Sequence, residues 1–301
     1  MRYIFILFII FLISPIKIYA QGTGGINVNP AFIDVEVEDP LERKVFQITY
    51  KNNGTDIIEL EIFPVDFTQT DERGTIGFLG REAGSYQYSL SSFLSFETNS
   101  VILDPGETKS INTTVSNRKD LSPGGHYSAI VGRIVPNEST TSATTTKIAP
   151  AVSSLVYLVK KGGESYNLSL KDVDWPKYPV VFNIPSTLVL TFQNEGNVHL
   201  TPFGTILVKD MLGREVFKGS LNNSSFKVMP SSRRIIPGYL NKLETIIPIS
   251  FMTMEIQGTD FGKNTNFVFR ESFIYINPLT LLILVVIVPV LFILRKKRKK
   301  K

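Results

Sequence analysis

Side chains able to carry out chemistry are few in this chain of 301 residues. It contains two histidines, His126 and His199, and no cysteine. Zinc sites in proteins are built mainly from these two residue types, so we predict no metal site and no cofactor. Neither histidine lies near a serine in a G-x-S-x-G nucleophile elbow. The sequence therefore predicts no catalytic residues and a protein that is not an enzyme.

Acidic residues are the remaining candidates for catalysis. Asp34, Glu36 and Glu38 alternate along a predicted strand. Because successive side chains of a strand point to opposite faces, this spacing favours a solvent-facing row of carboxylates. A hydrolase with a pair of carboxylates stays open as a third possibility for function.

One candidate binding segment is the turn that precedes a predicted strand, Gly124, Gly125, His126 and Tyr127. Glycine lets a ligand approach the backbone closely, and a tyrosine ring offers an amphipathic surface. The simpler interpretation is a tight turn with a structural role, and we favour it.

A second candidate is Trp175, the single tryptophan, which lies among prolines in the sequence D-W-P-K-Y-P. Its ring could stack on a sugar. The interpretation that we favour is a buried plug near the joint between two domains.

Most of the chain has the sequence pattern of an all-β protein. Short runs rich in β-branched and aromatic residues recur between Asn-Gly, Pro-Gly and Gly-Gly turns, which is typical of antiparallel sandwiches. The predicted strands are 32–37, 45–50, 57–63, 110–115, 127–135, 148–159, 166–173, 186–192, 204–209, 215–219, 233–236, 245–251 and 266–274.

A local repeat divides these strands into two series. Residues 48–54 and 190–196 both read as a strand that ends in an Asn-x-Gly turn, and we expect Gly54 to occupy a position with positive φ. We therefore predict two tandem immunoglobulin-like β-sandwiches, 21–160 and 161–274. The Gly pair at 162–163 suits a hinge between them.

The two ends predict export and anchoring. Residues 1–20 read as a signal peptide cleaved after Ala20, because their apolar run is too short to span a bilayer. Residues 275–294 read as one transmembrane helix, and the basic tail 295–301 is expected to stay in the cytoplasm. We predict a plasma-membrane protein with a single span and an extracellular ectodomain.

The charge distribution argues against a nucleic-acid partner. The net charge of +5 includes seven basic residues in the tail and two in the signal peptide. Removing these nine from 32 Lys and Arg leaves 23 against 27 Asp and Glu, a net charge of −4. A nucleic-acid-binding surface would be basic. An exported chain without cysteine, held by a basic-tailed anchor, points to a bacterial cell envelope.

Several motifs resemble a known family. They are N-P-A-F-I-D-V at 29–35, L-D-P-G-E-T at 103–108, P-G-G-H-Y at 123–127 and N-E-G-N-V-H-L-T-P-F-G at 194–204. These segments, in this order with the membrane helix, resemble the WxL-interacting proteins of Gram-positive surfaces. The resemblance implies that the first sandwich binds peptidoglycan and that the second binds a partner or host surface.

These observations lead to a functional hypothesis. We expect a non-enzymatic surface protein whose ectodomain binds cell-wall polymer or a surface protein. The alternative is an accessory subunit of a membrane export or transport complex, in which the helix makes the decisive contact.

Overall fold

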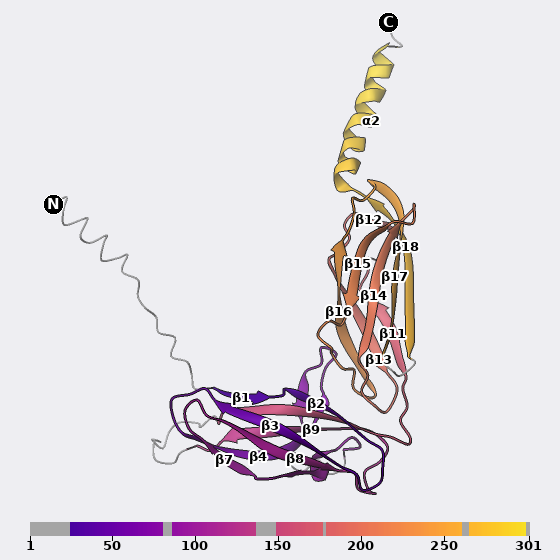
Figure 1. Cartoon of the computed structure of the whole chain (residues 1–301). Coiled ribbons are helices and arrows are strands. Elements are labelled where there is room, and N and C mark those ends of the chain that lie inside the picture. Colours follow the sequence, from indigo (N-terminus) through magenta and orange to yellow (C-terminus); the bar gives the residue numbers. More distant parts are fainter. Residues whose placement is uncertain (1–24, 81–85, 137–148, 177–178, 261–264, 299–301) are drawn as a thin grey trace, which may run out of the picture.

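The computed structural model describes residues 25–80, 86–136, 149–176, 179–260 and 265–298 (Figure 1). The predicted signal peptide lies outside these ranges and stays a prediction. Within these ranges the fold is all-β, as expected, with one long helix, α2 (Pro278–Arg298), near the C-terminal end.

The described residues of the first half of the chain form ten strands. They are β1 Ile26–Asn29, β2 Phe32–Val37, β3 Arg43–Asn52, β4 Ile58–Gln69, β5 Ile76–Phe78, β6 Leu94–Phe96, β7 Ser100–Leu103, β8 Thr108–Ser116, β9 Gly124–Ile134 and β10 Ala151–Lys160, with a 3-10 turn at Ser91–Phe93. They form two sheets, β1-β3-β8-β6 and β2-β10-β9-β4-β5, with β7 paired to β4. We call this unit the first sandwich.

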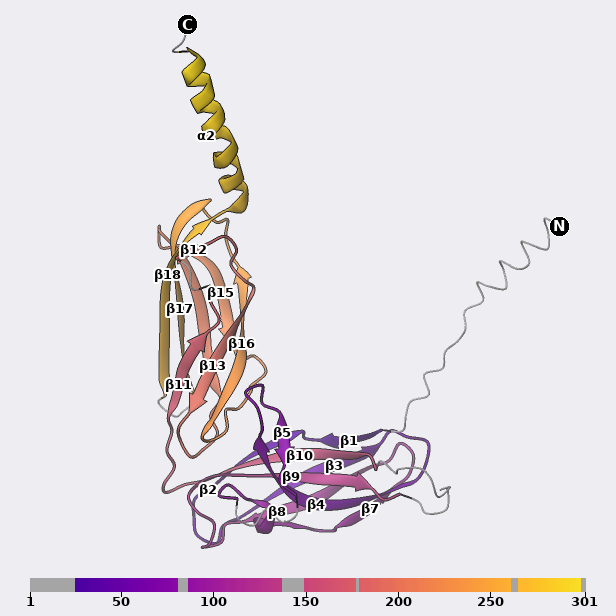
Figure 2. The same ribbon diagram turned by 180° about the vertical axis from the view of Figure 1, so that it is seen from behind.

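Eight strands follow. They are β11 Leu168–Val173, β12 Val180–Val181, β13 Thr187–Asn194, β14 Pro202–Asp210, β15 Glu215–Leu221, β16 Ser232–Lys242, β17 Ile249–Asp260 and β18 Asn266–Ile276. They form one continuous sheet, β11-β13-β16-β15-β14-β17-β18-β12. We call this unit the second sandwich. Figures 1 and 2 show it standing on one side of the first sandwich, with α2 at its far end.

The two sandwiches repeat one pattern of strand pairing. In the first, β1 pairs with β3 while β2 crosses to pair in parallel with the last strand, β10. In the second, β11 pairs with β13 while β12 pairs in parallel with the last strand, β18. The sequence repeat at 48–54 and 190–196 therefore reflects a repeat of architecture. The domain boundary at 160–161 stays a prediction.

Each sandwich has its own apolar core. Between the two sheets of the first lie Tyr50, Leu60, Ile130 and Leu158, all almost fully buried. The curved sheet of the second encloses a larger cluster that includes Leu190, Phe192, Ile206 and Met254. Burial of this kind contributes about 25 cal/mol per Å² of apolar surface, which supports two cores that hold together without disulfides.

The predicted Asn-x-Gly turns are present, but they are not built as expected. Gly54 does not have positive φ, because the turn is closed instead by the Asn52 side chain, whose Oδ1 accepts from the Gly54 N–H at 2.8 Å. Asn194 does the same for Gly196 at 2.9 Å. Both asparagines are buried at the end of equivalent strands, β3 and β13.

Three further expectations need correction. Two strand pairs are parallel, whereas a purely antiparallel pattern was predicted. The predicted strand 245–251 starts four residues later and runs on to Asp260, because β17 pairs along its length with β14 and β18. The predicted membrane helix does not start at Tyr275, which belongs to β18 and is buried in the second core.

The helix α2 follows β18 after one intervening residue. Its side chains from Leu279 to Ile287 are exposed apart from the partly buried Thr280, and Pro289 lies within it. In the part of the chain that the structure describes, no helix is long and apolar enough to cross a membrane.

Candidate functional site

The two sandwiches meet at an aromatic cluster. Phe67, Tyr127 and Tyr157 of the first sandwich pack together, with Phe67 and Tyr157 ring centroids 5.4 Å apart, and Met229 of the second sandwich packs against them. His199 of the second sandwich adds a ring 5.2 Å from Tyr157 and 5.6 Å from Tyr127. These rings form a buried joint rather than a flexible link.

A charged clamp lies beside this cluster. On β2, the Asp34 carboxylate accepts hydrogen bonds from Lys227 Nζ at 2.8 and 2.9 Å, and His199 Nε2 lies 3.3 Å from its Oδ1. Burial alone would raise the pKa of Asp34, but the hydrogen bonds from His199 and Lys227 outweigh it and lower the pKa to about 2. The clamp therefore extends the pH range over which Asp34 is ionised from about 3.8 down to about 2.

Backbone contacts close one side of the joint. Gly125 N–H donates to the Asn197 carbonyl at 2.8 Å, and Asn197 Nδ2 donates to the Gly163 carbonyl at 2.9 Å. A Cβ on Gly124, whose φ is +116°, would lie 3.1 Å from Asn197. Glycine at this position therefore permits a close approach of the second sandwich.

The hairpin of β4 and β5 closes the other side, reaching towards the second sandwich (Figure 2). At its tip, the Glu72 carbonyl accepts from the Ile235 N–H at 2.6 Å, and Gln69 Nε2 donates to the Arg233 carbonyl. With contacts on both sides and a cluster between them, the structure fixes the two sandwiches relative to each other.

Next to the clamp lies an open cleft of about 450 Å³ to which both sandwiches contribute. Its lining includes the aromatic residues Phe32, Tyr157 and Phe203 and the polar residues Asp34, His199 and Lys227. Lys227 Nζ lies over the Tyr157 ring, 5.0 Å from its centroid. Phe32 is the most exposed of these three aromatic residues, with 54 % of its surface accessible to solvent. Ring faces beside a few polar groups are what binding pockets commonly present to a ligand.

The structure places most of the predicted binding segment in the joint. Gly124 and Gly125 contact Asn197, and the Tyr127 side chain has no exposed surface. Burial raises the pKa of Tyr127 well above its usual value. The favoured structural role thus fits their surroundings, but the predicted turn is wrong: all four residues belong to β9 and pair with β10, and the start of this strand contacts the second sandwich. Their role in binding stays a prediction.

His126 is also buried. Its Nδ1 lies 2.9 Å from the Ser89 carbonyl and its Nε2 lies 2.8 Å from the Ser122 carbonyl. Burial lowers the pKa of His126, and the two carbonyl groups oppose this effect. The ring ties the 3-10 turn region to the start of β9.

Trp175 is a buried plug, but not at the joint. Its ring packs on Phe273 with centroids 4.9 Å apart, near the end of β18 that leads to α2. The expected place was wrong because the β11–β12 connection runs to the opposite end of the second sandwich. With only 7 % of its surface exposed, Trp175 is part of the core there.

Sequence reasoning missed the residues that form the clamp and the cleft. The predicted solvent-facing carboxylates are confirmed, because Asp34, Glu36 and Glu38 are exposed, but the partner of Asp34, Lys227, lies 193 residues away in the sequence. A signal was present in the segment 199–203, because His199 and Phe203 lie close together in the sequence and both line the cleft. Among the residues that the structure describes, no three His, Asp or Glu side chains gather as a set of metal ligands.

No family model matches the sequence, and no curated protein matches it. Among solved structures, the chain is similar to the class 5 fimbriae chaperone CfaA, with 13 % identity, a TM-score of 0.43, and coverage of 82 % of this chain and 99 % of that one. It is also similar to the E. coli chaperone DraB, with 8 % identity, a TM-score of 0.38, and coverage of 83 % and 97 %. A protein of unknown function from Porphyromonas gingivalis W83 has 13 % identity, a TM-score of 0.31, and coverage of 84 % and 99 %. Likenesses at these scores say nothing of what this chain binds.

Proposed function

We propose that this chain is a non-enzymatic binding protein of the bacterial cell surface and that the cleft between its two sandwiches binds a polymer of the cell wall. One observation carries the proposal: a cleft of about 450 Å³, lined by aromatic rings and polar side chains, lies at a joint fixed by contacts on both sides. Binding to a preformed cleft costs less ordering entropy than binding to a hinge that must close.

The lining favours a sugar polymer as the ligand. The faces of Phe32 and Phe203 can stack on the apolar faces of sugar rings, while Asp34 and Lys227 can exchange hydrogen bonds with hydroxyl or amide groups. The cleft is open, so a long polymer can pass through it without threading an end. The choice of wall polymer also draws support from the resemblance to WxL-interacting proteins.

The proposed location is the outer face of the plasma membrane. Support comes from the apolar segment 275–294, from the basic tail 295–301 and from the exposed apolar side chains on the first half of α2. The described residues of α2 do not by themselves form a membrane span, so the proposed attachment rests on the sequence of the segment 275–294. In this arrangement the two sandwiches extend from the membrane towards the wall.

Sedimentation of the full chain with purified insoluble cell wall tests the proposal. The chain should pellet with the wall and should still do so in about 0.5 M salt, where the Debye length falls to roughly 4 Å. Phe32→Ala removes a ring from the cleft and should reduce the pelleted fraction. Phe78→Ala is the matched control, because Phe78 has the same exposure, 54 %, but lies on β5 outside the cleft lining.

Two outcomes would count against the proposal. Release by salt would mean unspecific charge attraction, and equal loss in both variants would mean that the cleft is not the site. If the chain does not pellet with the wall but binds a surface protein, and Phe32→Ala abolishes that binding, the ligand of the cleft would be a protein and not a wall polymer.

A further inference from the structure

The end of the second sandwich nearest α2 exposes an unusual number of large apolar side chains. We call this set the apolar rim; its members are Phe182, Met211, Leu212, Leu243, Ile249 and Phe251, with exposed fractions from 46 to 68 %. Single exposed apolar residues are common on protein surfaces, but a contiguous group marks a contact with a partner or a membrane.

Strand register places these residues at one level. Asp210, the last residue of β14, pairs with Met252 near the start of β17, and Ile249 pairs with Ile276 at the end of β18. On the other edge, Val181 of β12 pairs with Tyr275. Met211, Phe251 and Phe182 are adjacent to these positions, and the Leu243 N–H donates to the Val216 carbonyl near the start of β15, so the rim residues lie at the end of the second sandwich from which α2 leaves (Figure 1).

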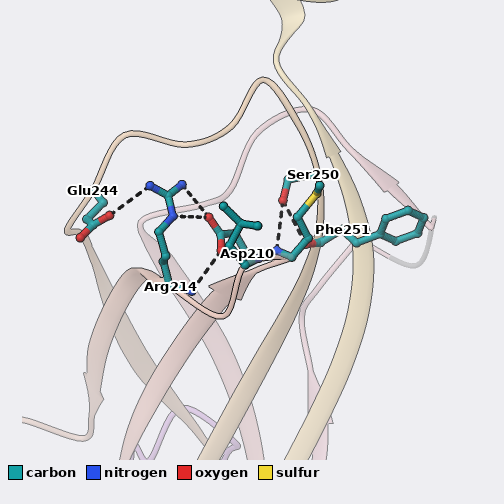
Figure 3. Close-up of polar contacts among 7 residues, drawn as sticks. Asp210, Arg214, Glu244, Ser250 and Phe251 are labelled. Atoms are coloured by element: carbon teal, nitrogen blue, oxygen red, sulfur yellow. Dashed lines mark hydrogen bonds and ion pairs between the residues drawn. The ribbon is translucent and has the colours of Figure 1, made fainter.

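The turn that carries Met211 and Leu212 is built to hold them outward. Beneath it, the Asp210 carboxylate, which has no exposed surface, accepts from the backbone N–H groups of Leu212 at 2.9 Å and Arg214 at 3.0 Å. The Arg214 guanidinium donates to the same carboxylate at 2.7 Å (Figure 3). The exposure of Leu212 therefore belongs to a hydrogen-bonded turn.

Across from this turn, Glu244 lies 3.4 Å from Arg214, and Phe251 points away from the polar network (Figure 3). The charged groups thus pair with each other within the loops, leaving apolar side chains at the tips.

We infer that the apolar rim rests on a lipid surface, inserting its tips at the boundary between headgroups and acyl chains. The occupant is argued from α2, which leaves the second sandwich at the same end as the rim and whose exposed side chains between Leu279 and Ile287 are apolar. The described residues of α2 do not by themselves form a membrane span, but a lipid surface that contacts this half of the helix would also contact the rim. The inference rests on the membrane location proposed above.

Contact at the rim would have a mechanical consequence. One helix alone leaves the ectodomain free to tilt about its anchor, whereas six apolar side chains around that anchor hold the second sandwich upright on the membrane. The joint is fixed, so the cleft would then be held at a set height above the bilayer.

Because the chain has no cysteine, single substitutions can carry a fluorescent probe without background labelling. The full chain is reconstituted in phosphatidylcholine and phosphatidylglycerol vesicles, with a polarity-sensitive probe at Leu212→Cys. Val268→Cys is the matched control, since Val268 has nearly the same exposure, 67 % against 68 %, but lies at the other end of β18. Val285→Cys reports on α2 itself.

The inference predicts emission at shorter wavelength and loss of quenching by aqueous iodide at Leu212→Cys and Val285→Cys, with neither change at Val268→Cys. A shielded Val285→Cys beside a water-exposed Leu212→Cys would overturn the rim contact while leaving the anchor intact. Water exposure at both would overturn the membrane location as well. Shielding of Leu212→Cys that appears only at high protein-to-lipid ratio would assign the rim to a second copy and would also overturn the inference.

Discussion

At the scale of the residue, Asp34 shows how one carboxylate links the two sandwiches. Its pKa falls from 3.8 to about 2 on folding, so folding favours the ionised form. The stabilisation is therefore complete above pH 3.8 and is lost as the pH falls towards 2. Because half of the side chain is exposed, we discount the shift for solvent screening and expect about 1 kcal/mol.

Asp34→Asn should accordingly lower the free energy of unfolding by about 1 kcal/mol at neutral pH. The difference from the wild type should close as the pH approaches 2, since the wild type then loses the same charge. Urea unfolding across this pH range measures both. Asp172→Asn, at an exposed position on β11, is the control and should show no such convergence. A difference that stays constant with pH would contradict the account of the clamp.

The paired asparagines allow a second test. Asn194 Nδ2 donates to the carbonyls of Val198 at 2.7 Å and Val228 at 2.9 Å, and Asn52 Nδ2 donates to the Asp56 carbonyl at 2.8 Å. Replacing either by alanine leaves buried carbonyls without a donor, which should cost about 2–3 kcal/mol. Thermal unfolding should show a large loss for Asn52→Ala and Asn194→Ala.

Asn53→Ala is the control for this test, because Asn53 is exposed beside Asn52. If Asn53→Ala destabilised the chain as much as Asn52→Ala, the side-chain hydrogen bonds would not be what builds the turn.

The sequence indicated these turns because Asn and Gly recur at one spacing. It could not show which of the two residues does the structural work, since that depends on burial and on carbonyl groups up to 52 residues away. The partners of Asp34 are still more distant, and no local pattern marks them.

At the scale of the element, the hairpin of β4 and β5 controls the joint. Gly74 at its tip has a φ of +84°, and a Cβ there would lie 2.3 Å from the Arg234 guanidinium carbon. Gly74→Ala should displace Arg234 from its hydrogen bond to the Lys227 carbonyl and loosen the joint. Spin labels at Ile102→Cys and Val268→Cys, one on each sandwich, measure the effect as a broader distance distribution.

Gly80→Ala is a close control, because Gly80 has a φ of +78° and open space around its Cβ position. Both substitutions place a Cβ at a positive φ and carry similar backbone strain, about 1 kcal/mol. Only the Cβ at position 74 would meet a residue of the second sandwich. Equal broadening in both would mean that the tip of the hairpin does not position the sandwiches.

Element prediction worked where strands are long and alternate. Residues 32–37 were predicted with the observed bounds, and β8, β9 and β13 were found within a few residues. The short strands β1, β5, β6, β7 and β12 were missed, since two to four residues cannot establish a period of two. Because β5 was missed, the hairpin that it forms with β4 and that reaches the second sandwich was missed as well.

At the scale of the whole molecule, the repeat of two sandwiches followed from the sequence, but the cleft did not. A cleft between domains depends on their relative placement, which here results from Asp34, Gly125 and the hairpin tip acting together. Each of these contacts joins residues that are distant in the sequence. The resemblance implied that the first sandwich alone binds peptidoglycan, whereas the proposed cleft for a wall polymer needs both sandwiches.

The most direct test of the cleft as the binding site is protection of a thiol inside it. Thr201→Cys lies in the cleft lining, and Thr253→Cys, a partly buried threonine on β17 outside that lining, is its control. Soluble cell-wall fragments at saturating concentration should slow modification of Thr201→Cys by a water-soluble maleimide and should leave Thr253→Cys unchanged. An unchanged rate at Thr201→Cys, with the fragments shown to be bound, would contradict the account.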